Sequence, residues 1–120
     1  MPAKILIVED NADSRDCLAL LLKEKGYKVY TAEDGEQGIK LVEADCPDII
    51  VTDINMPHMN GIEMVRLLRD RPDCSKLPII VVSAHGSGSL KDAMSAGADD
   101  TMRKPIDFVL LAEAIERLLE

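Results

Sequence analysis

The feature that most constrains the fold is an alternation of short apolar runs and longer amphipathic segments, repeated five times along the chain. The runs predict strands at 4–8, 28–32, 49–52, 79–82 and 100–102. The segments between them predict helices at 13–25, about 35–44, 62–70 and 90–96, with a last helix marked by Phe108, Leu111, Ile115 and Leu118. Such alternation predicts an α/β fold, a parallel sheet with helices on both faces.

Length and composition indicate how many domains the chain forms and whether it contacts a membrane. A chain of 120 residues with 47% hydrophobic and 30% charged residues is expected to form one compact domain, 1–120. No apolar stretch approaches the roughly 20 residues of a membrane span, and the amino terminus has no signal-peptide core. We therefore expect a cytoplasmic protein without membrane contact.

The net charge and the cysteine content argue against nucleic-acid binding, a disulfide framework and a zinc site. A formal net charge of −8 opposes binding to phosphate backbones, so no direct nucleic-acid contact is expected. Cys17, Cys46 and Cys74 are odd in number and widely spaced. They indicate neither a disulfide framework nor a zinc site, and reduced thiols are expected.

Polar residues stand where the predicted strands end. Glu9 and Asp10 follow the first strand, Asp53 the third, Ser83 the fourth and Lys104 the fifth. Because parallel strands end at one edge of the sheet, and ligands of such sheets bind there, these side chains are expected to lie together.

Their chemistry indicates a metal and a phosphoryl group. Three carboxylates held close together repel one another, and a divalent cation with hard oxygen ligands, such as Mg²⁺, removes that conflict. Asp53 could then act as a nucleophile that forms an aspartyl phosphate. Lys104 and Ser83 could contact the phosphoryl oxygens.

Each residue also has an ordinary structural interpretation. Asp10 or Asn11 could cap the first helix, and Asp53 could be an Asx-turn residue. Ser83 could be a hydroxyl at the start of a loop, and Lys104 a solvated charge. The coincidence of polar residues at four strand ends favours the functional interpretation over these alternatives.

With these residues identified, the sequence resembles the receiver domain of two-component response regulators over essentially its whole length. The motifs are I-L-I-V-E-D-N at 5–11, D-I-N-M-P-H-M-N-G at 53–61, V-V-S-A at 81–84 and K-P at 104–105. The resemblance implies a flavodoxin-like, doubly wound (βα)5 fold with three layers. Its five parallel strands would have the order 2-1-3-4-5.

The resemblance also implies a role for each site residue. Asp53 matches the phosphoacceptor, and Ser83 and Lys104 match the residues that contact the phosphoryl group. Pro105 matches a proline held in a cis peptide bond. The metal, Mg²⁺ with Mn²⁺ as an alternative, would be held by Glu9, Asp10, Asp53 and the backbone carbonyl of Asn55.

The chain departs from the family at one position and leaves two histidines to interpret. Met102 occupies the switch position, where the family usually has Tyr or Phe, so an aromatic readout is in doubt. Met102 could repack there or simply fill the core. His85 flanks the site and could tune phosphate lifetime by protonation, or it could be an exposed residue without a role. His58 is expected to have no specific role.

The resemblance implies a signalling module that is phosphorylated by a histidine kinase or a histidine phosphotransfer protein. Its downstream partner would be a protein that contacts the fourth helix, fifth strand and fifth helix, where Leu110 and Ala114 are expected to form an exposed apolar patch. A phosphohydrolase with an aspartyl intermediate is one alternative, but it needs a second Asp where this chain has Asn55. An interaction module with a vestigial site is the other alternative.

Overall fold

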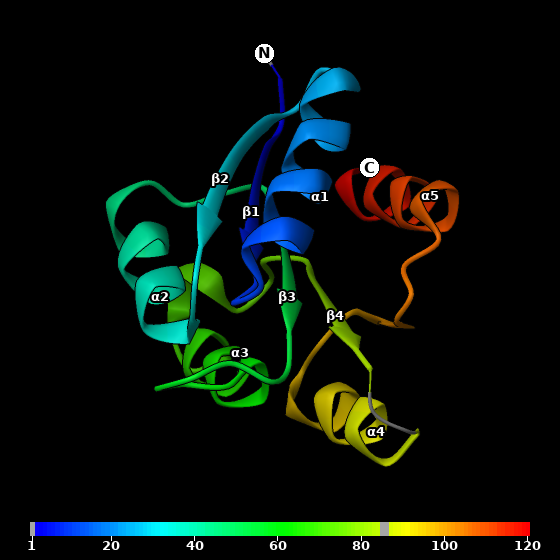
Figure 1. Ribbon diagram of the computed structural model, residues 1–120. Coiled ribbons are helices and arrows are strands. Elements are labelled where there is room, and N and C mark those ends of the chain that lie inside the picture. Colours follow the sequence, from blue (N-terminus) through cyan, green and yellow to red (C-terminus); the bar gives the residue numbers. More distant parts are fainter. Residues whose placement is uncertain (1, 85–86) are drawn as a thin grey trace.

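A single parallel sheet organises the molecule, which is seen in a computed structural model that describes residues 2–84 and 87–120. Within the described residues the strand order is β2-β1-β3-β4-β5, as the resemblance implies (Figure 1). The strands are β1 (Lys4–Val8), β2 (Lys28–Ala32), β3 (Ile49–Asp53), β4 (Ile79–Ser83) and β5 (Asp100–Arg103). The helices are α1 (Ala12–Glu24), α2 (Gly35–Ala44), α3 (Gly61–Arg69), α4 (Ser87–Ala96) and α5 (Phe108–Leu119), with a short 3-10 helix, η1 (Pro72–Cys74).

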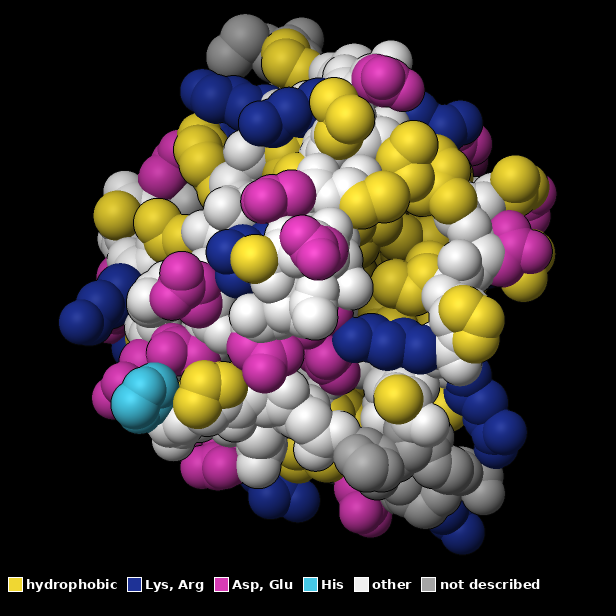
Figure 2. Space-filling model, viewed as in Figure 1, with side chains coloured by type: hydrophobic (Ala, Val, Ile, Leu, Met, Phe, Trp, Pro, Cys, Tyr) yellow, Lys and Arg dark blue, Asp and Glu magenta, His cyan; other side chains and the backbone are white. Residues whose placement is uncertain are grey.

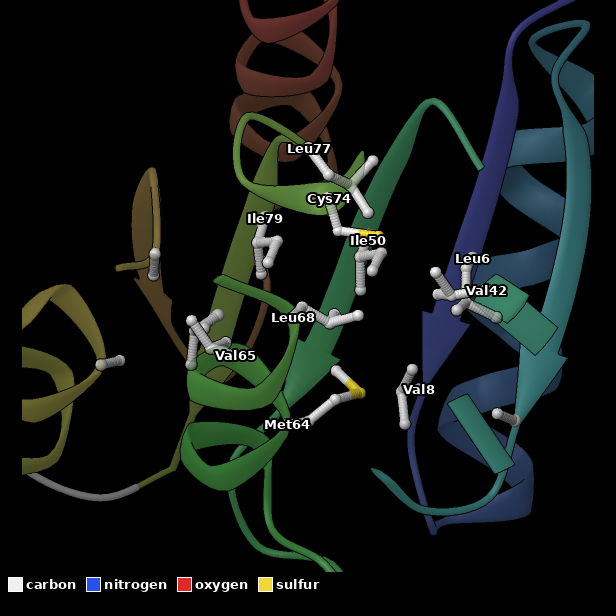
Figure 3. Close-up of a cluster of buried hydrophobic side chains, with 14 of the residues drawn as sticks. Leu6, Val8, Val42, Ile50, Met64, Val65, Leu68, Cys74, Leu77 and Ile79 are labelled. Carbon is white, nitrogen blue, oxygen red and sulfur yellow. The ribbon is translucent and has the colours of Figure 1, made fainter. Parts of the chain in front are cut away.

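Helices cover both faces of the sheet and create two hydrophobic cores. Successive residues of a strand point to opposite faces, so the central strands β1, β3 and β4 contribute to both cores. Leu6 and Ile50 join the core beneath α2 and α3, shown in Figure 3. Ile7 and Val51 join the core beneath α1 and α5. These three strands are therefore buried on both sides, which explains their mostly apolar sequences, whereas β2 and β5 at the sides of the sheet are more exposed and more polar.

Polar caps start the helices near the edge where the strands end. Each cap side chain accepts a hydrogen bond from a backbone N–H of the first helical turn, which would otherwise lack a partner. These caps are Asn11 for α1, Asp34 for α2, Asn60 for α3 and Asp107 for α5. The local sequence thus turns the chain from strand into helix directly above the sheet.

The structure corrects one expectation about the surface. Ala114 was expected to lie in an exposed patch with Leu110, but it is buried at 3% exposure, whereas Leu110 is 52% exposed. Ala114 precedes Ile115 and lies beside Leu111 on the covered side of α5, so the buried face of this helix is wider than a narrow stripe. Among the described residues, no helix is long and apolar enough to cross a membrane.

Candidate phosphoryl-transfer site

Lys104 joins two carboxylates from different strands at the carboxyl edge of the sheet. Its Nζ donates hydrogen bonds of 2.7 Å to Glu9 Oε1 and of 2.7 Å to Asp53 Oδ2. Glu9 follows β1, Asp53 is the last residue of β3, and Lys104 follows β5. The two carboxylate side chains are only 8% and 9% exposed. Such shielding strengthens their attraction to the ammonium group relative to a surface ion pair.

Burial and charge shift the pKa values at this edge. Burial raises the pKa of Glu9, and the nearby negative charge of Asp53 adds to this effect, although the hydrogen bond from Lys104 opposes it. Burial alone would lower the pKa of Lys104, but hydrogen bonds to Asp53 and Glu9 outweigh it and the net pKa is raised. Lys104 is therefore a cation at neutral pH. Because the pKa of Glu9 stays raised despite Lys104, a further positive charge beside these carboxylates would be favourable.

Three acidic residues at this edge fit a small divalent cation. Glu9, Asp10 and Asp53 each present a carboxylate oxygen, and these oxygens lie within 4.8 Å of one another. Asp10 is exposed, so water could complete the coordination shell. An all-oxygen donor set open to water matches the preference of Mg²⁺ and excludes a soft metal site.

The backbone around Asp53 is held tightly on both sides. All five residues of β3 are buried, and Asp53 Oδ1 accepts a 2.7 Å hydrogen bond from the N–H of Ile54. The Gly61 N–H donates to the Ile54 carbonyl at 2.9 Å. A Cβ at position 61 would overlap the carbonyl oxygen of Asp53, so the start of α3 reaches this loop only with glycine.

The neighbouring strands carry the other predicted site residues. Ser83 ends β4 and is fully buried, one residue beyond Val82, which pairs with Asp53. The Lys104 N–H donates to the Ser83 carbonyl at 2.9 Å, and the Lys104–Pro105 peptide bond is cis. Met102 pairs with Val82 across the sheet and packs, half-buried, against the core beneath α1 and α5.

The ordinary interpretation holds for the cap of the first helix and fails for Asp53 and Lys104. Asn11, not Asp10, caps α1 by accepting from the Ser14 N–H at 2.9 Å. Asp53 accepts from the adjacent N–H of Ile54, whereas an Asx-turn would use the N–H two residues on. Lys104 is paired twice, so it is not a solvated charge.

Two further residues, Asn55 and His85, were also predicted to belong to the site. Asn55 is exposed two residues after Asp53. His85 lies outside the described residues.

Arg15 belongs to this edge and was missed by the sequence analysis. Its Nη1 donates a 3.0 Å hydrogen bond to the Glu9 carbonyl, and its Nη2 lies 3.9 Å from Glu33 Oε1. Neither contact belongs to a motif, since one is to a backbone carbonyl and the other to a residue between β2 and α2, so motif spacing did not reveal them. One signal existed: an arginine in the first turns of a helix opposes the helix dipole and needs a compensating acidic neighbour.

A groove of about 410 Å³ opens beside Glu9 and Lys104. Its walls are mostly apolar and come from α1 and from the segment that leads into α5, including Leu18, Leu21, Ile106 and Phe108. Figure 2 shows this hollow as a patch of hydrophobic side chains next to acidic and basic ones. A partner seated there would come within reach of the carboxylates.

Known proteins share both the sequence and the fold. The family model of the response regulator receiver domain matches residues 5–116. The response regulator MprA of Mycolicibacterium vanbaalenii is 39% identical over 120 residues, which are 99% of this chain and 51% of that protein. The chain therefore spans about half the length of this curated relative.

Solved structures of receiver domains have the same fold as this chain. The signal receiver domain of a signal transduction histidine kinase from Syntrophus aciditrophicus has a TM-score of 0.91 and 32% identity, covering 98% of this chain and 89% of that one. The receiver domain of the sensor histidine kinase PA1611 from Pseudomonas aeruginosa PAO1, described with a magnesium ion coordinated in the active site cleft, has a TM-score of 0.92 and 28% identity, covering 99% of this chain and 98% of that one. Because the family match extends over nearly all of the chain and the fold agrees, the chain belongs to the response regulator receiver domain family.

Proposed function

We propose that Asp53 accepts a phosphoryl group from a phosphohistidine of a histidine kinase or a histidine phosphotransfer protein. The observation that carries this proposal is the ammonium group of Lys104, which contacts both Asp53 and Glu9 at 2.7 Å. Receiver domains interact with histidine kinases and with downstream effectors, and the apolar groove beside the carboxylates gives such a donor an approach. This role is expected in the cytoplasm.

The transfer forms one bond and breaks one. A carboxylate oxygen of Asp53 attacks phosphorus while the phosphorus–nitrogen bond of the phosphohistidine breaks, so the imidazole leaves with the electron pair. Lys104 already contacts Asp53 and can stabilise the charge on the phosphoryl oxygens, and the Ser83 hydroxyl is assigned to a second oxygen.

Glu9, Asp10, Asp53 and the backbone carbonyl of Asn55 are the proposed ligands of Mg²⁺, with Mn²⁺ as an alternative. Support comes from the clustered carboxylate oxygens and from the magnesium described in the Pseudomonas aeruginosa relative. When bound, the cation neutralises charge on the phosphoryl group. Arg15 holds the backbone of Glu9 and so positions this acidic segment.

Phosphorylation is proposed to act as a switch that a downstream protein reads at α4, β5 and α5. This region presents Met94, Val109 and Leu110 with 47%, 64% and 52% of their surfaces exposed. Large apolar side chains exposed on α4 and α5 are candidates for contact with a protein partner. Met102, in place of the usual aromatic residue, would repack within β5 during the switch, and His85 is proposed to tune phosphate lifetime.

A switch is favoured over a phosphatase by Asn55. A phosphatase with an aspartyl intermediate needs a general acid two residues after the nucleophile, and an amide cannot donate a proton in that role. The aspartyl phosphate is therefore expected to persist rather than to turn over rapidly.

The proposal is tested by incubating the protein with a small acyl phosphate, with and without Mg²⁺, and following its intact mass. We expect one phosphoryl adduct that requires Mg²⁺ and is absent from Asp53→Asn. The matched control is Asp16→Asn, which removes an exposed carboxylate of α1 and should leave the adduct unchanged. Rapid release of phosphate over many turnovers would indicate a phosphohydrolase, and no adduct at all would indicate a vestigial site.

A further inference from the structure

The first residue of α2 contacts the loop that follows the acceptor. Gly35 is buried, and its N–H donates a 3.1 Å hydrogen bond to the Met59 carbonyl. The first amides of a helix have no partner within the helix, so they can bind another segment of the chain. In Figure 1 the loop between β3 and α3 runs below α2. The start of α2 is therefore tied to the loop that contains Asn55.

Only glycine fits this contact. A Cβ at position 35 would lie 2.8 Å from the Met59 carbonyl oxygen and 2.8 Å from Met59 Cγ, and both distances are shorter than a real Cβ tolerates. The Cγ atom belongs to a flexible side chain and can move aside. The carbonyl oxygen belongs to the backbone, so the loop itself would have to move away from α2.

The loop is held at two points. The Gly61 N–H donates to the Ile54 carbonyl at 2.9 Å, and the Gly35 N–H holds the Met59 carbonyl further along. Among the backbone hydrogen bonds of the described residues, the one from Gly35 joins this loop to an element other than β3 or α3. Asn55 lies between the two points, so the position of its carbonyl depends on both of them.

The turn before α2 also contacts the acidic segment. The Glu9 N–H donates to the carbonyl of Ala32, the last residue of β2, at 3.0 Å. Arg15, which donates to the Glu9 carbonyl, has its Nη2 3.9 Å from Glu33 Oε1. The turn and the first residue of α2 therefore contact both parts of the proposed Mg²⁺ site, the segment of Glu9 on one side and the loop after β3 on the other.

We propose that Gly35 is a positioning residue for Mg²⁺ binding. Its N–H fixes the loop that carries the Asn55 carbonyl relative to Glu9 and Asp10, so that the cation meets donors that are already in place. Such preorganisation lowers the cost of binding, although Gly35 itself touches neither the cation nor the phosphoryl group. The inference rests on the proposed function, because it concerns the same Mg²⁺ ligands.

The first test is urea unfolding of the full chain at a series of Mg²⁺ concentrations. The shift of the unfolding midpoint with Mg²⁺ gives the Kd of the folded protein, and a loss of stability in the absence of Mg²⁺ does not enter this Kd. We expect Gly35→Ala to raise the Kd about tenfold, as the loss of a residue that orients metal ligands does. Met59→Ala should bind Mg²⁺ like wild type, because it keeps the hydrogen bond to the backbone carbonyl.

Gly97→Ala is the matched control. Its φ is 121° and a Cβ there would lie 2.8 Å from Arg69 Cγ, so this variant should also lose stability. Gly97 precedes β5 at the opposite edge of the sheet, so its substitution should leave the Kd for Mg²⁺ unchanged. An equal rise of the Kd in Gly97→Ala and Gly35→Ala would show a general effect of destabilisation and would overturn the positioning role.

Amide hydrogen exchange in wild type gives a second measurement, which requires no variant to fold. If the bond between Gly35 and Met59 favours Mg²⁺ binding, Mg²⁺ must favour that bond, because coupling between two sites is reciprocal. The reference is the Asp45 amide, which donates to the Leu41 carbonyl at the other end of α2. Saturating Mg²⁺ should slow exchange of the Gly35 amide roughly threefold more than that of Asp45, and equal slowing would contradict the proposal.

The two proposals fail in different ways. Asp10→Asn removes a proposed Mg²⁺ ligand and should remove most of the Mg²⁺-dependent shift of the midpoint. If wild type shows no shift, or if Asp10→Asn keeps it, the metal site itself is wrong and the role of Gly35 is wrong with it. If both behave as expected but Gly35→Ala has the Kd of wild type, only the role of Gly35 is wrong.

Discussion

At the scale of single residues, Gly61 is the position in the loop after Asp53 where one added carbon atom would have the largest effect. A Cβ at this position would overlap the Asp53 carbonyl oxygen, which belongs to the backbone and cannot rotate away. We predict that Gly61→Ala lowers the free energy of unfolding by about 1–3 kcal/mol. It should also slow adduct formation from an acyl phosphate roughly tenfold or more, because the acceptor carboxylate shifts.

Gly26 provides the control for this prediction. Its φ of 98° disfavours any other residue, but nothing lies within 4 Å of a Cβ there. Gly26→Ala should therefore cost stability, as urea unfolding will show, without changing the rate of adduct formation. Equal rates for Gly61→Ala and wild type would contradict the role given to Gly61.

Lys104 makes stability depend on pH through its carboxylate partners. Lys104→Met removes the hydrogen bond that lowers the pKa of Glu9, so the already raised pKa of this group should rise further. The folded state then binds the proton more tightly than the unfolded state, so stability is highest at low pH and is lost as pH rises through the folded pKa. Each further unit by which the folded pKa of Glu9 rises lowers the free energy of unfolding at high pH by about 1.4 kcal/mol.

Urea unfolding of Lys104→Met and wild type at pH 5 and pH 8, with chelator present, measures this effect. We expect the variant to lose more stability than wild type between the two pH values, and Mg²⁺ to reduce that difference. The same loss in both proteins would show that Lys104 does not control the ionisation of Glu9.

Among the elements, the loop between β3 and α3 contains a strained turn. His58 has a φ of 67°, and the Met59 N–H donates to the Pro57 carbonyl at 2.7 Å, which closes a γ-turn around it. Residues other than glycine are costly in this conformation. We predict that His58→Gly is more stable than His58→Ala by about 1 kcal/mol.

The matched pair for this prediction is Lys40→Gly and Lys40→Ala at an exposed position in α2. There the order should reverse, with alanine more stable by about 1 kcal/mol. Thermal or urea unfolding of the four variants measures these differences. If alanine is the more stable substitution at both positions, the turn at His58 is not strained.

The elements also show how far the sequence alone could lead. The strands were predicted almost to the residue. Burial on both faces makes the sequences of β1, β3 and β4 mostly apolar, whereas β2 and β5 are less buried and give a weaker signal. Position 87 begins α4 three residues before the predicted start at 90, since Ser and Gly residues have low helix propensity and give no periodic signal. The η1 turn was missed because its three residues, Pro72–Cys74, are too few to show a helical period.

The grouping of the predicted site residues was anticipated to a similar extent. Glu9, Asp53 and Lys104 lie together as expected, because each stands at the end of a strand and the fold brings such ends together. The contact of Arg15 with the Glu9 carbonyl could not be found this way, because it depends on the path of a side chain and not on its place in a motif. Ala114 was misplaced because a small residue gives a weak hydrophobic signal.

At the scale of the whole molecule, Arg69 joins parts of the chain that the sheet does not connect. From the end of α3 it donates to the carbonyls of Gly97, Cys74 and Leu77 at 2.9, 3.1 and 2.7 Å, and it contacts Asp99 at 2.8 Å. We predict that Arg69→Met lowers the free energy of unfolding by about 3 kcal/mol or more, because several partly buried acceptors lose their donor.

Arg71→Met is the control, since it removes one ion pair with Glu43 between side chains that are 37% and 49% exposed. Such exposed pairs contribute about 1 kcal/mol or less. Chemical unfolding should therefore separate the two variants clearly, and equal losses would show that Arg69 does not connect these segments in solution.

The division of the central strands between two cores limits how the chain can change in length. In β3, Ile50 faces one core while Ile49 and Val51 face the other. A residue inserted within this strand would turn every later side chain to the wrong face and would rotate Asp53 as well. Insertions that preserve packing are therefore expected only in the loops. The alternating burial that builds the two cores thus also keeps the orientation of Asp53 fixed when the chain changes in length.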